Sequence, residues 1–162
     1  MRDPRIRPVA DADVPAIVQL VHDLAEYERE PDSCHLTADQ LRTALFGPQP
    51  ALFGHVAEAD GEVVGFALWF LNFSTWEGVH GIWLEDLYVH PDHRATGLGR
   101  ALLLTLAGIA DERGYARVEW AVLDWNTPSI DFYRGLGAAS MDDWTTFRLT
   151  GTALRLRSAD GR

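Results

Sequence analysis

The sequence of 162 residues predicts one α/β domain over residues 1–162, with helices flanking a mixed central β-sheet. Three observations support this fold class. A hydrophobic fraction of 47% is enough for a single core. Two apolar, β-rich runs are joined by Asp60-Gly61, which is the strongest short signal for an antiparallel hairpin. A glycine-containing loop then leads from a third apolar run into a helical pattern that starts at Leu98.

The N-terminal segment predicts a short strand and then an amphipathic helix. Ile6–Val9 favours the strand, and either Asp11 or Asp13 is expected to cap the helix. The polar face of this helix is acidic, and we interpret it as solvated surface or a steering field. The apolar positions recur at helical spacing: Val14, Ile17, Val18, Val21, Leu24 and Ala25. The acidic positions are Asp23, Glu26, Glu28 and Glu30.

A second helix and the hairpin follow. Thr37 and Gln40 have capping-box spacing, which predicts a helix that ends before Gly47-Pro48. Leu52–Ala59 and Val63–Phe73 are the two strands of the hairpin. The elements expected after it are a strand at Ile82–Val89, a helix from Leu98 to Gly114, a strand at Val118–Leu123, a helix from Thr127 to Gly137, and closing strands at Thr146–Leu149 and Ala153–Leu156.

Charge and cysteine content narrow the classes of function. The 24 acidic residues outnumber the 14 basic ones, all of which are arginine, and the net charge is -10. This balance disfavours a nucleic-acid surface and suits either cationic partners or plain solubility. The single Cys34 cannot form an intramolecular disulfide, which indicates a reducing compartment. No apolar run has the length of a signal peptide or membrane span, so we expect a soluble, cytoplasmic protein.

The loop before Leu98 is the first candidate site. Arg94, Gly97 and Gly99 precede or open the helix, where glycines allow close backbone approach and the helix dipole favours an anion. Such a loop suits a pyrophosphate, although glycines at helix entries also serve packing alone. It is not a Walker loop, because the chain has no lysine, and it lacks the three spaced glycines of the dinucleotide fingerprint.

Arg94-x-x-Gly97-x-Gly99 after a strand resembles the acetyl-CoA pyrophosphate loop of the GNAT superfamily of N-acetyltransferases. Within it the sequence is most similar to the spermidine/spermine and thialysine N-acetyltransferase group. The segments that carry this likeness are Ile6-Arg7-Pro8, Leu24-Ala25-Glu26-Tyr27-Glu28, Val64-Gly65-Phe66-Ala67, Leu84-Glu85-Asp86 and the run from Trp125-Asn126-Thr127-Pro128-Ser129-Ile130 to Tyr133. The resemblance implies the GNAT fold, acetyl-CoA as cosubstrate, no metal and a homodimer.

The resemblance also implies roles for individual residues. Glu85 matches the proposed general base, the Leu87 N–H is expected to stabilise the oxyanion, and Tyr133 matches the general acid. Alternatives are an ion pair with an arginine for Glu85 and simple packing beside Phe132 for Tyr133. Asp86 should point to the opposite face unless a β-bulge, typical of this strand in the family, re-aims it.

Two further sets of residues follow from the same likeness. The implied cofactor-binding residues are Leu87, Tyr88, Val89, Arg94, Ala95, Thr96, Gly97, Leu98, Gly99, Arg100, Asn126, Ser129 and Tyr133. The implied substrate-binding residues are Trp76, Glu85, Asp86, Trp125, Asp142, Asp143 and Trp144. Asn126 could also be a helix cap, and each tryptophan could instead belong to the core or a dimer interface.

The function expected from these features is acetyl transfer from acetyl-CoA to a primary amine of a small cationic substrate, polyamine-like or diamine-like. Carboxylates beside aromatic rings suit a cationic alkyl chain. Alternatives are a thialysine-like amino acid, an aminoglycoside or a protein amine as acceptor, or a non-catalytic acyl-CoA-binding module. His90 and His93 are expected to shape the loop rather than bind a metal, and Cys34 to be inert.

Overall fold

The computed structural model describes residues 3–155 and divides the chain into two compact units, Met1–Leu123 and Asp124–Arg162. The first unit holds a five-stranded sheet in the order β1-β2-β3-β4-β5. All neighbouring strands are antiparallel except β4 and β5, which are parallel, so the predicted mixed sheet is confirmed. The strands are β1 (Ile6–Pro8), β2 (Phe53–Ala59), β3 (Glu62–Ser74), β4 (Val79–Val89) and β5 (Val118–Glu119).

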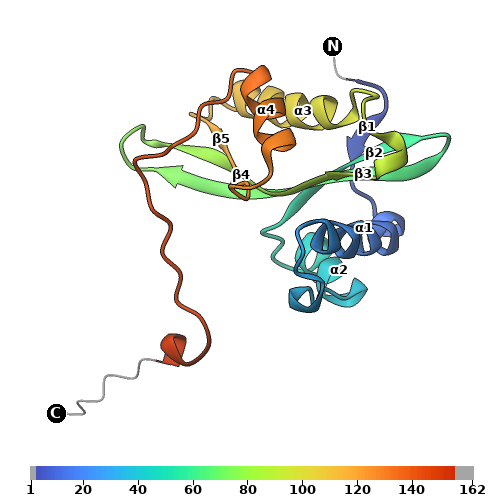
Figure 1. Cartoon of the computed structure of the whole chain (residues 1–162), viewed down its shortest axis with the longest axis horizontal. Helices are drawn as coiled ribbons and strands as arrows, with labels where there is room; N and C mark the ends of the chain where they lie inside the picture. Colours follow the sequence, from blue (N-terminus) through green and yellow to red (C-terminus); the bar gives the residue numbers. More distant parts are fainter. Residues whose placement is uncertain (1–2, 156–162) are drawn as a thin grey trace. The chain divides into compact units, whose positions relative to one another are not determined.

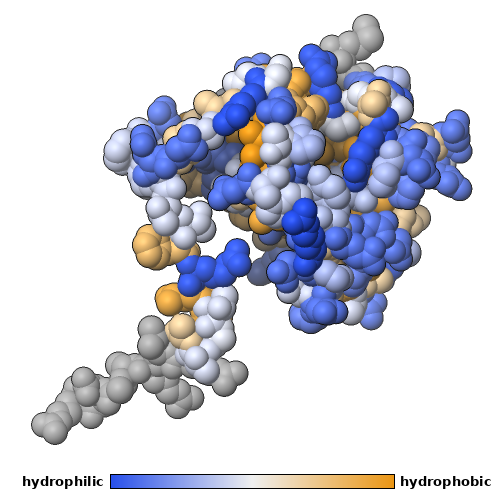
Figure 2. Space-filling model, viewed as in Figure 1, coloured by the Kyte–Doolittle hydropathy of each residue, from blue (hydrophilic) through white to orange (hydrophobic). Residues whose placement is uncertain are grey.

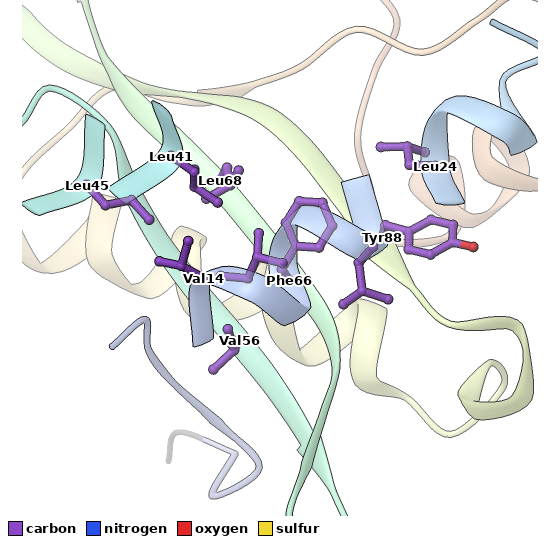
Figure 3. Packing of buried hydrophobic residues seen from close by; sticks show 10 residues of the cluster. Val14, Leu24, Leu41, Leu45, Val56, Phe66, Leu68 and Tyr88 are labelled. Atoms are coloured by element: carbon purple, nitrogen blue, oxygen red, sulfur yellow. The ribbon is translucent and has the colours of Figure 1, made fainter. Parts of the chain in front are cut away.

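Helices cover both faces of this sheet (Figure 1). The helices of the first unit are α1 (Val14–Tyr27), α2 (Ala38–Phe46) and α3 (Leu98–Glu112). α1 and α2 lie on one face, and α3 lies on the other. On the α1 face, Phe66 and Ile17 are fully buried in a cluster that also contains Leu24 and Tyr88 (Figure 3). This apolar core fixes the end of α1 against β4, next to the candidate site.

The hairpin between β2 and β3 forms where Asp60-Gly61 predicts it. Asp60 has φ of 52° and Gly61 has φ of 81°, and two successive positive values are the mark of the turn that matches strand twist. Thr37 caps α2 as expected: its side chain accepts a hydrogen bond from the Gln40 N–H at 3.3 Å, and the Thr37 N–H donates to Gln40 Oε1 at 2.9 Å.

The predicted side-chain cap of α1 is wrong. Asp13 is the N-cap residue, but its carboxylate does not cap the helix. It accepts one hydrogen bond from the Ala10 N–H at 2.7 Å and two from the Arg7 guanidinium at 2.7 and 2.9 Å. Asp11 instead accepts from Arg42 at 2.8 Å. Both carboxylates are therefore used to join segments rather than to cap the helix, because a charged partner binds a carboxylate more strongly than a neutral N–H does.

The predicted closing strands are also wrong within the described residues. Residues 144–150 form neither helix nor strand, Gly151–Arg155 is a short 3-10 turn, and Leu156 lies outside the described residues. Alternation of Thr146, Phe147, Arg148 and Leu149 is a strand pattern, but a strand needs a hydrogen-bonded neighbour, and this segment pairs with none in residues 3–155.

The second unit contains α4 (Thr127–Gly135), with Asn126 as its N-cap. After α4 the described chain runs extended (Figure 1), and its apolar side chains are exposed, as Figure 2 shows in orange on this segment. The exposed apolar residues are Met141, Trp144, Phe147, Leu149 and Leu154. Among residues 3–155 no helix has both the length and the apolar content needed to cross a bilayer.

Candidate active site

A β-bulge at Glu85 organises the centre of β4. Leu68 on β3 pairs with Asp86, whereas the next residue, Trp69, pairs with Leu84, so Glu85 is the extra residue. The bulge expected in this strand is therefore present. It leaves Glu85 exposed, with its Oε2 accepting a hydrogen bond from the Trp83 Nε1–H at 3.1 Å. A residue at a bulge is re-aimed relative to its strand, which presents this carboxylate to solvent beside the core.

The same bulge decides which face Asp86 occupies. Directly paired residues share a face, so Asp86 lies on the α1 side with Leu68, while Leu84 lies on the opposite side with Trp69. Burial is the largest cause that raises the pKa of Asp86, and together with the charges of Glu85 and Glu28 it raises this pKa to about 6. At neutral pH a carboxyl group with this pKa is mostly ionised, so Asp86 can hold a cation.

Glu28 is a part of the site whose role the sequence did not reveal. It is the C-cap of α1, and burial raises the pKa of its carboxyl group. Glu28 is half-buried and so less solvated than Glu26 and Glu30 of the same acidic face, which are exposed. The next residue, Arg29, has φ of 66°, and the Glu30 N–H donates to the Ala25 carbonyl at 2.9 Å, a Schellman-type ending that turns the chain at Glu28. In the sequence, the signal that includes Glu28 is the segment from Leu24 to Glu28, which is one of the segments that resemble the family.

Among residues 3–155, no strand pairs with the β5-facing edge of β4 beyond Trp83, and this part is called the open edge below. The parallel pairing includes only Ile82 with Val118 and Trp83 with Glu119, so the predicted strand to Leu123 is cut to two residues. The His90 N–H donates to Val64 on β3 at 2.8 Å. Because N–H groups alternate along a strand, those of Leu87 and Val89 point to the open edge.

The loop from β4 to α3 presents a bare helix N-terminus. Ala95 and Gly97 have φ of 60° and 84°, and Gly97 is the N-cap of α3 with no side chain to cap the first turn. The Thr96 hydroxyl donates to the His93 carbonyl at 2.6 Å, and the Arg5 guanidinium donates to the Thr96 carbonyl at 3.1 Å. The loop is thus held in shape while the first N–H groups of α3 stay available to an anion.

The two arginines of the loop face different surroundings. The Arg94 Nε–H donates to the Val89 carbonyl at 3.0 Å, and its guanidinium lies over the rings of Tyr27 and Tyr88. Arg100 is exposed in the first turn of α3 and lines a groove of about 620 Å³. The other lining residues are Asp3, Pro4, Arg5, Gly97, Ala101, Leu104, Thr105, Gly108 and Glu112.

Within the second unit, Asn126 is only 6% exposed, and its Oδ1 accepts from the Ser129 N–H at 3.4 Å. The helix-cap alternative for Asn126 is therefore confirmed. The cap uses the side-chain oxygen of Asn126, so it does not exclude cofactor binding by this residue. Tyr133 lies two turns further along α4, with its ring 5.3 Å from that of Phe132. The cap thus sets the start of the helix that carries Tyr133.

The residues predicted to bind substrate fall into separate groups. Glu85 and Asp86 are adjacent, but Trp76 is 93% exposed in the turn between β3 and β4. From Val79 to Glu85 the strand extends roughly 20 Å, so Trp76 and Glu85 of one chain do not meet. Trp125, Asp142, Asp143 and Trp144 belong to the second unit, where the Ser140 hydroxyl donates to Asp142 at 2.9 Å.

His90 and His93 lie in the loop that the sequence predicts them to shape. The His90 and His93 rings are 6.1 Å apart, edge to face, and the His90 Nδ1 accepts from the Asp92 N–H at 3.3 Å. No group of three or more metal-ligating side chains occurs in the described part of the chain. The ring of His90 thus has its contacts within the loop, while the His90 N–H holds the start of the loop to β3.

An open strand edge, a bulged strand with carboxylates and an uncapped helix form the framework of an acyl-CoA-dependent transferase. A model of the acetyltransferase (GNAT) family matches residues 17–138, and the chain belongs to this family. Acetyl-CoA is the cosubstrate of the family, and the chain is an N-acetyltransferase that acts on amines.

Named relatives and solved structures agree with this assignment. The chain is 36% identical over 161 residues to the thialysine N-epsilon-acetyltransferase of Bos taurus, covering 93% of this chain and 94% of that protein. It is 31% identical to the human spermidine/spermine N(1)-acetyltransferase-like protein 1, covering 89% of this chain and 22% of that protein. An integron cassette protein from the mobile metagenome of V. cholerae shares the fold, with a TM-score of 0.79 at 23% identity, covering 96% and 97% of the two chains.

Proposed function

We propose that the acceptor is a terminal primary amine on a small cationic molecule, polyamine-like or diamine-like. The observation that carries this proposal is the group of three carboxylates, Glu28, Glu85 and Asp86, where the end of α1 meets the bulge of β4. Burial and the charges of Glu85 and Glu28 raise the pKa of Asp86, so Asp86 lacks enough nearby positive charge. A substrate with one or two ammonium groups would supply it.

The cofactor side of the site fits acetyl-CoA. The open edge at Leu87 and Val89 offers N–H groups to the amides of the pantetheine arm, and the first turn of α3 offers N–H groups to the pyrophosphate. Support also comes from the length of the family match, which includes parts of both units. We therefore propose one GNAT domain over residues 1–162, and we propose that Asn126, Ser129 and Tyr133 bind the cofactor.

The proposed chemistry forms a bond between the nitrogen and the acetyl carbon, breaks the bond from that carbon to sulfur, and moves three protons. The nitrogen loses one proton before it attacks and a second one afterwards, the sulfur gains one from Tyr133, and the second proton from the nitrogen replaces the one that Tyr133 gave. An alkyl ammonium has a pKa near 10.4, so its deprotonation at pH 7 costs roughly 4 to 5 kcal/mol and needs an acceptor close to the nitrogen. Glu85 takes this proton, directly or through water, while Asp86 and Glu28 hold the cationic chain. The Leu87 N–H stabilises the charge that develops on the thioester oxygen, and Tyr133 protonates the departing thiolate.

A thialysine-like amino acid is the second candidate acceptor, because the Bos taurus relative acts on thialysine. The two candidates differ in charge: an amino acid carries a carboxylate, which Glu28, Glu85 and Asp86 would repel, whereas a diamine carries none. The three carboxylates therefore favour a diamine-like acceptor, because the end of the substrate that binds beside them should carry no negative charge.

An amine panel tests this proposal. Acetyl-CoA and each of a set of polyamines, diamines, thialysine, lysine, aminoglycosides and peptide amines are incubated with the protein, and released CoA is measured with a thiol reagent. We expect the highest kcat/KM for a polyamine or diamine. A higher value for thialysine would favour the second candidate. Acetyl-CoA binding by calorimetry without turnover on any amine would instead show a non-catalytic acyl-CoA-binding module.

We also propose a cytoplasmic homodimer. The apolar side chains that follow α4 support the association, because Trp144 is 74% and Phe147 is 91% exposed, and aromatic side chains of this size are costly in water. The single Cys34, which is free, is consistent with a reducing compartment.

A further inference from the structure

The side chain of Arg94 joins the end of β4 to the end of α1, which is far away in the sequence. Its Nε–H donates to the carbonyl of Val89 at the end of β4. Its guanidinium carbon is 5.2 Å from the ring centre of Tyr27 and 5.3 Å from that of Tyr88. A planar guanidinium stacks on aromatic faces in a way that a lysine ammonium does not, so this arrangement depends on arginine in particular.

The two rings belong to the elements that carry the acceptor carboxylates. Tyr27 is the last residue of α1 and directly precedes Glu28. Tyr88 lies two residues after Asp86 on β4, shares its face of the sheet, and is only 6% exposed in the core cluster with Leu24. Contact of one guanidinium with both rings therefore fixes the separation between the end of α1 and this part of β4.

We propose that Arg94 is a positioning residue for the acceptor side of the site, which holds Glu28 beside Asp86 through its contacts with Tyr27 and Tyr88. This inference rests on the proposed acetyl transfer to a cationic amine. It differs from the implied role of Arg94 in binding the pyrophosphate. In this structure the Nε–H and the face of the guanidinium are engaged by Val89, Tyr27 and Tyr88, and the backbone of the loop and Arg100 remain for the pyrophosphate.

The consequence is a coupling between the two substrates that needs no change of fold. The Arg94 side chain is anchored to the loop that leads into α3, and its rings flank the carboxylates. A cofactor that orders this loop would also order the end of α1, so acceptor binding should improve when CoA is bound. Arg94 would carry that coupling without touching the amine.

Steady-state kinetics and calorimetry on the full chain test the inference. Arg94→Gln and Arg94→Lys should each raise the KM for the best amine by roughly 3- to 30-fold, the range expected when a stacked cation is lost. The dissociation constant for acetyl-CoA should change by less than about twofold. The matched control is Arg113→Gln, because Arg113 also lies over two rings, those of Trp69 and Tyr115 at 5.9 Å each, at the far end of α3. It should leave both constants unchanged.

A double-mutant cycle separates positioning from general loss of structure. Tyr27→Leu should raise the amine KM by a similar factor, and the double variant Arg94→Gln/Tyr27→Leu should be no worse than the poorer single variant. Additive effects would overturn the inference. So would a tenfold weaker affinity of Arg94→Gln for acetyl-CoA with an unchanged amine KM, since that result would make Arg94 a cofactor ligand. Absence of turnover by the unmodified chain would instead overturn the proposed function.

Discussion

At the scale of single residues, Glu85 and Asp86 are neighbours in sequence with different surroundings. The bulge leaves Glu85 exposed and hydrogen-bonded to Trp83, while Asp86 is partly buried on the α1 face near Glu28. These environments favour different roles: an exposed carboxylate can exchange its proton with water, and a buried one is suited to hold a cation. Substitution of each residue in turn distinguishes the two roles.

Glu85→Gln should lower kcat by roughly 10²- to 10⁴-fold, which is the usual contribution of a general base. Asp86→Asn should act mainly on the amine KM. Both are measured as CoA release at saturating acetyl-CoA. Glu62→Gln, an exposed carboxylate at the start of β3, is the control and should behave as the unmodified chain. A Glu85→Gln variant with full kcat would exclude Glu85 as the base.

The pKa of Asp86 predicts a pH-dependent effect on stability. In the folded state it is raised from 3.8 to about 6, so between these values the folded chain keeps a proton that the unfolded chain releases. The free energy of unfolding therefore falls as pH rises through this window, and Asp86 is destabilising above pH 6. Asp86→Asn should raise the free energy of unfolding at pH 7.5 by about 1 to 3 kcal/mol.

Urea unfolding at two pH values measures this gain. At about pH 3, below both pKa values, the carboxyl group is mostly protonated in both states, so most of the difference between the two chains should disappear. A gain of equal size at both pH values would mean that packing, and not ionisation, separates the aspartate from the asparagine.

At the scale of elements, the start of α3 has a backbone conformation that favours glycine, at the place where the pyrophosphate is proposed to bind. Gly97 has φ of 84°, and a Cβ added there would come no nearer than 3.9 Å to the Arg5 guanidinium, so any cost of a side chain comes from the backbone. Gly114, just after α3, has φ of 67° and open space around it. The two glycines therefore have the same conformational need at opposite ends of one helix.

Gly97→Ala and Gly114→Ala should each lower the free energy of unfolding by about 1 kcal/mol. Only Gly97→Ala should also weaken acetyl-CoA binding, by several-fold, because only this residue shapes the N–H groups expected to meet the pyrophosphate. Urea unfolding and calorimetry give the two quantities. Equal acetyl-CoA affinity in both variants would place the pyrophosphate elsewhere.

At the scale of the whole molecule, the apolar side chains after α4 should determine the state of association. The chain has a mass of 18.1 kDa, and light scattering at micromolar concentration should give about twice this value for the homodimer. Trp144→Ser/Phe147→Ser should shift the mass toward that of one chain. Phe46→Ser, which alters a 44% exposed residue at the end of α2, should not. A single-chain mass for the unmodified protein would exclude the homodimer.

The sequence alone predicted most of the fold, because the signals involved are local. The capping box at Thr37, the turn at Asp60-Gly61 and the glycine loop before α3 each act within a few residues, and each appears where it was expected. The predictions that were wrong concern features that depend on a partner from another segment of the chain. Asp13 binds Arg7 instead of capping α1, and the strand pattern at Thr146–Leu149 has no strand to pair with in residues 3–155.

The same division holds for the candidate site. The sequence by itself indicates the residues proposed to carry the chemistry, since Glu85, Asp86 and the glycine loop lie close together along one strand and turn. Only the tertiary structure decided that Asp86 faces α1, that Glu28 approaches it and that Arg94 lies between Tyr27 and Tyr88. These contacts depend on the register of β3 with β4 and on the ending of α1, and no pattern within a single segment encodes how two segments meet.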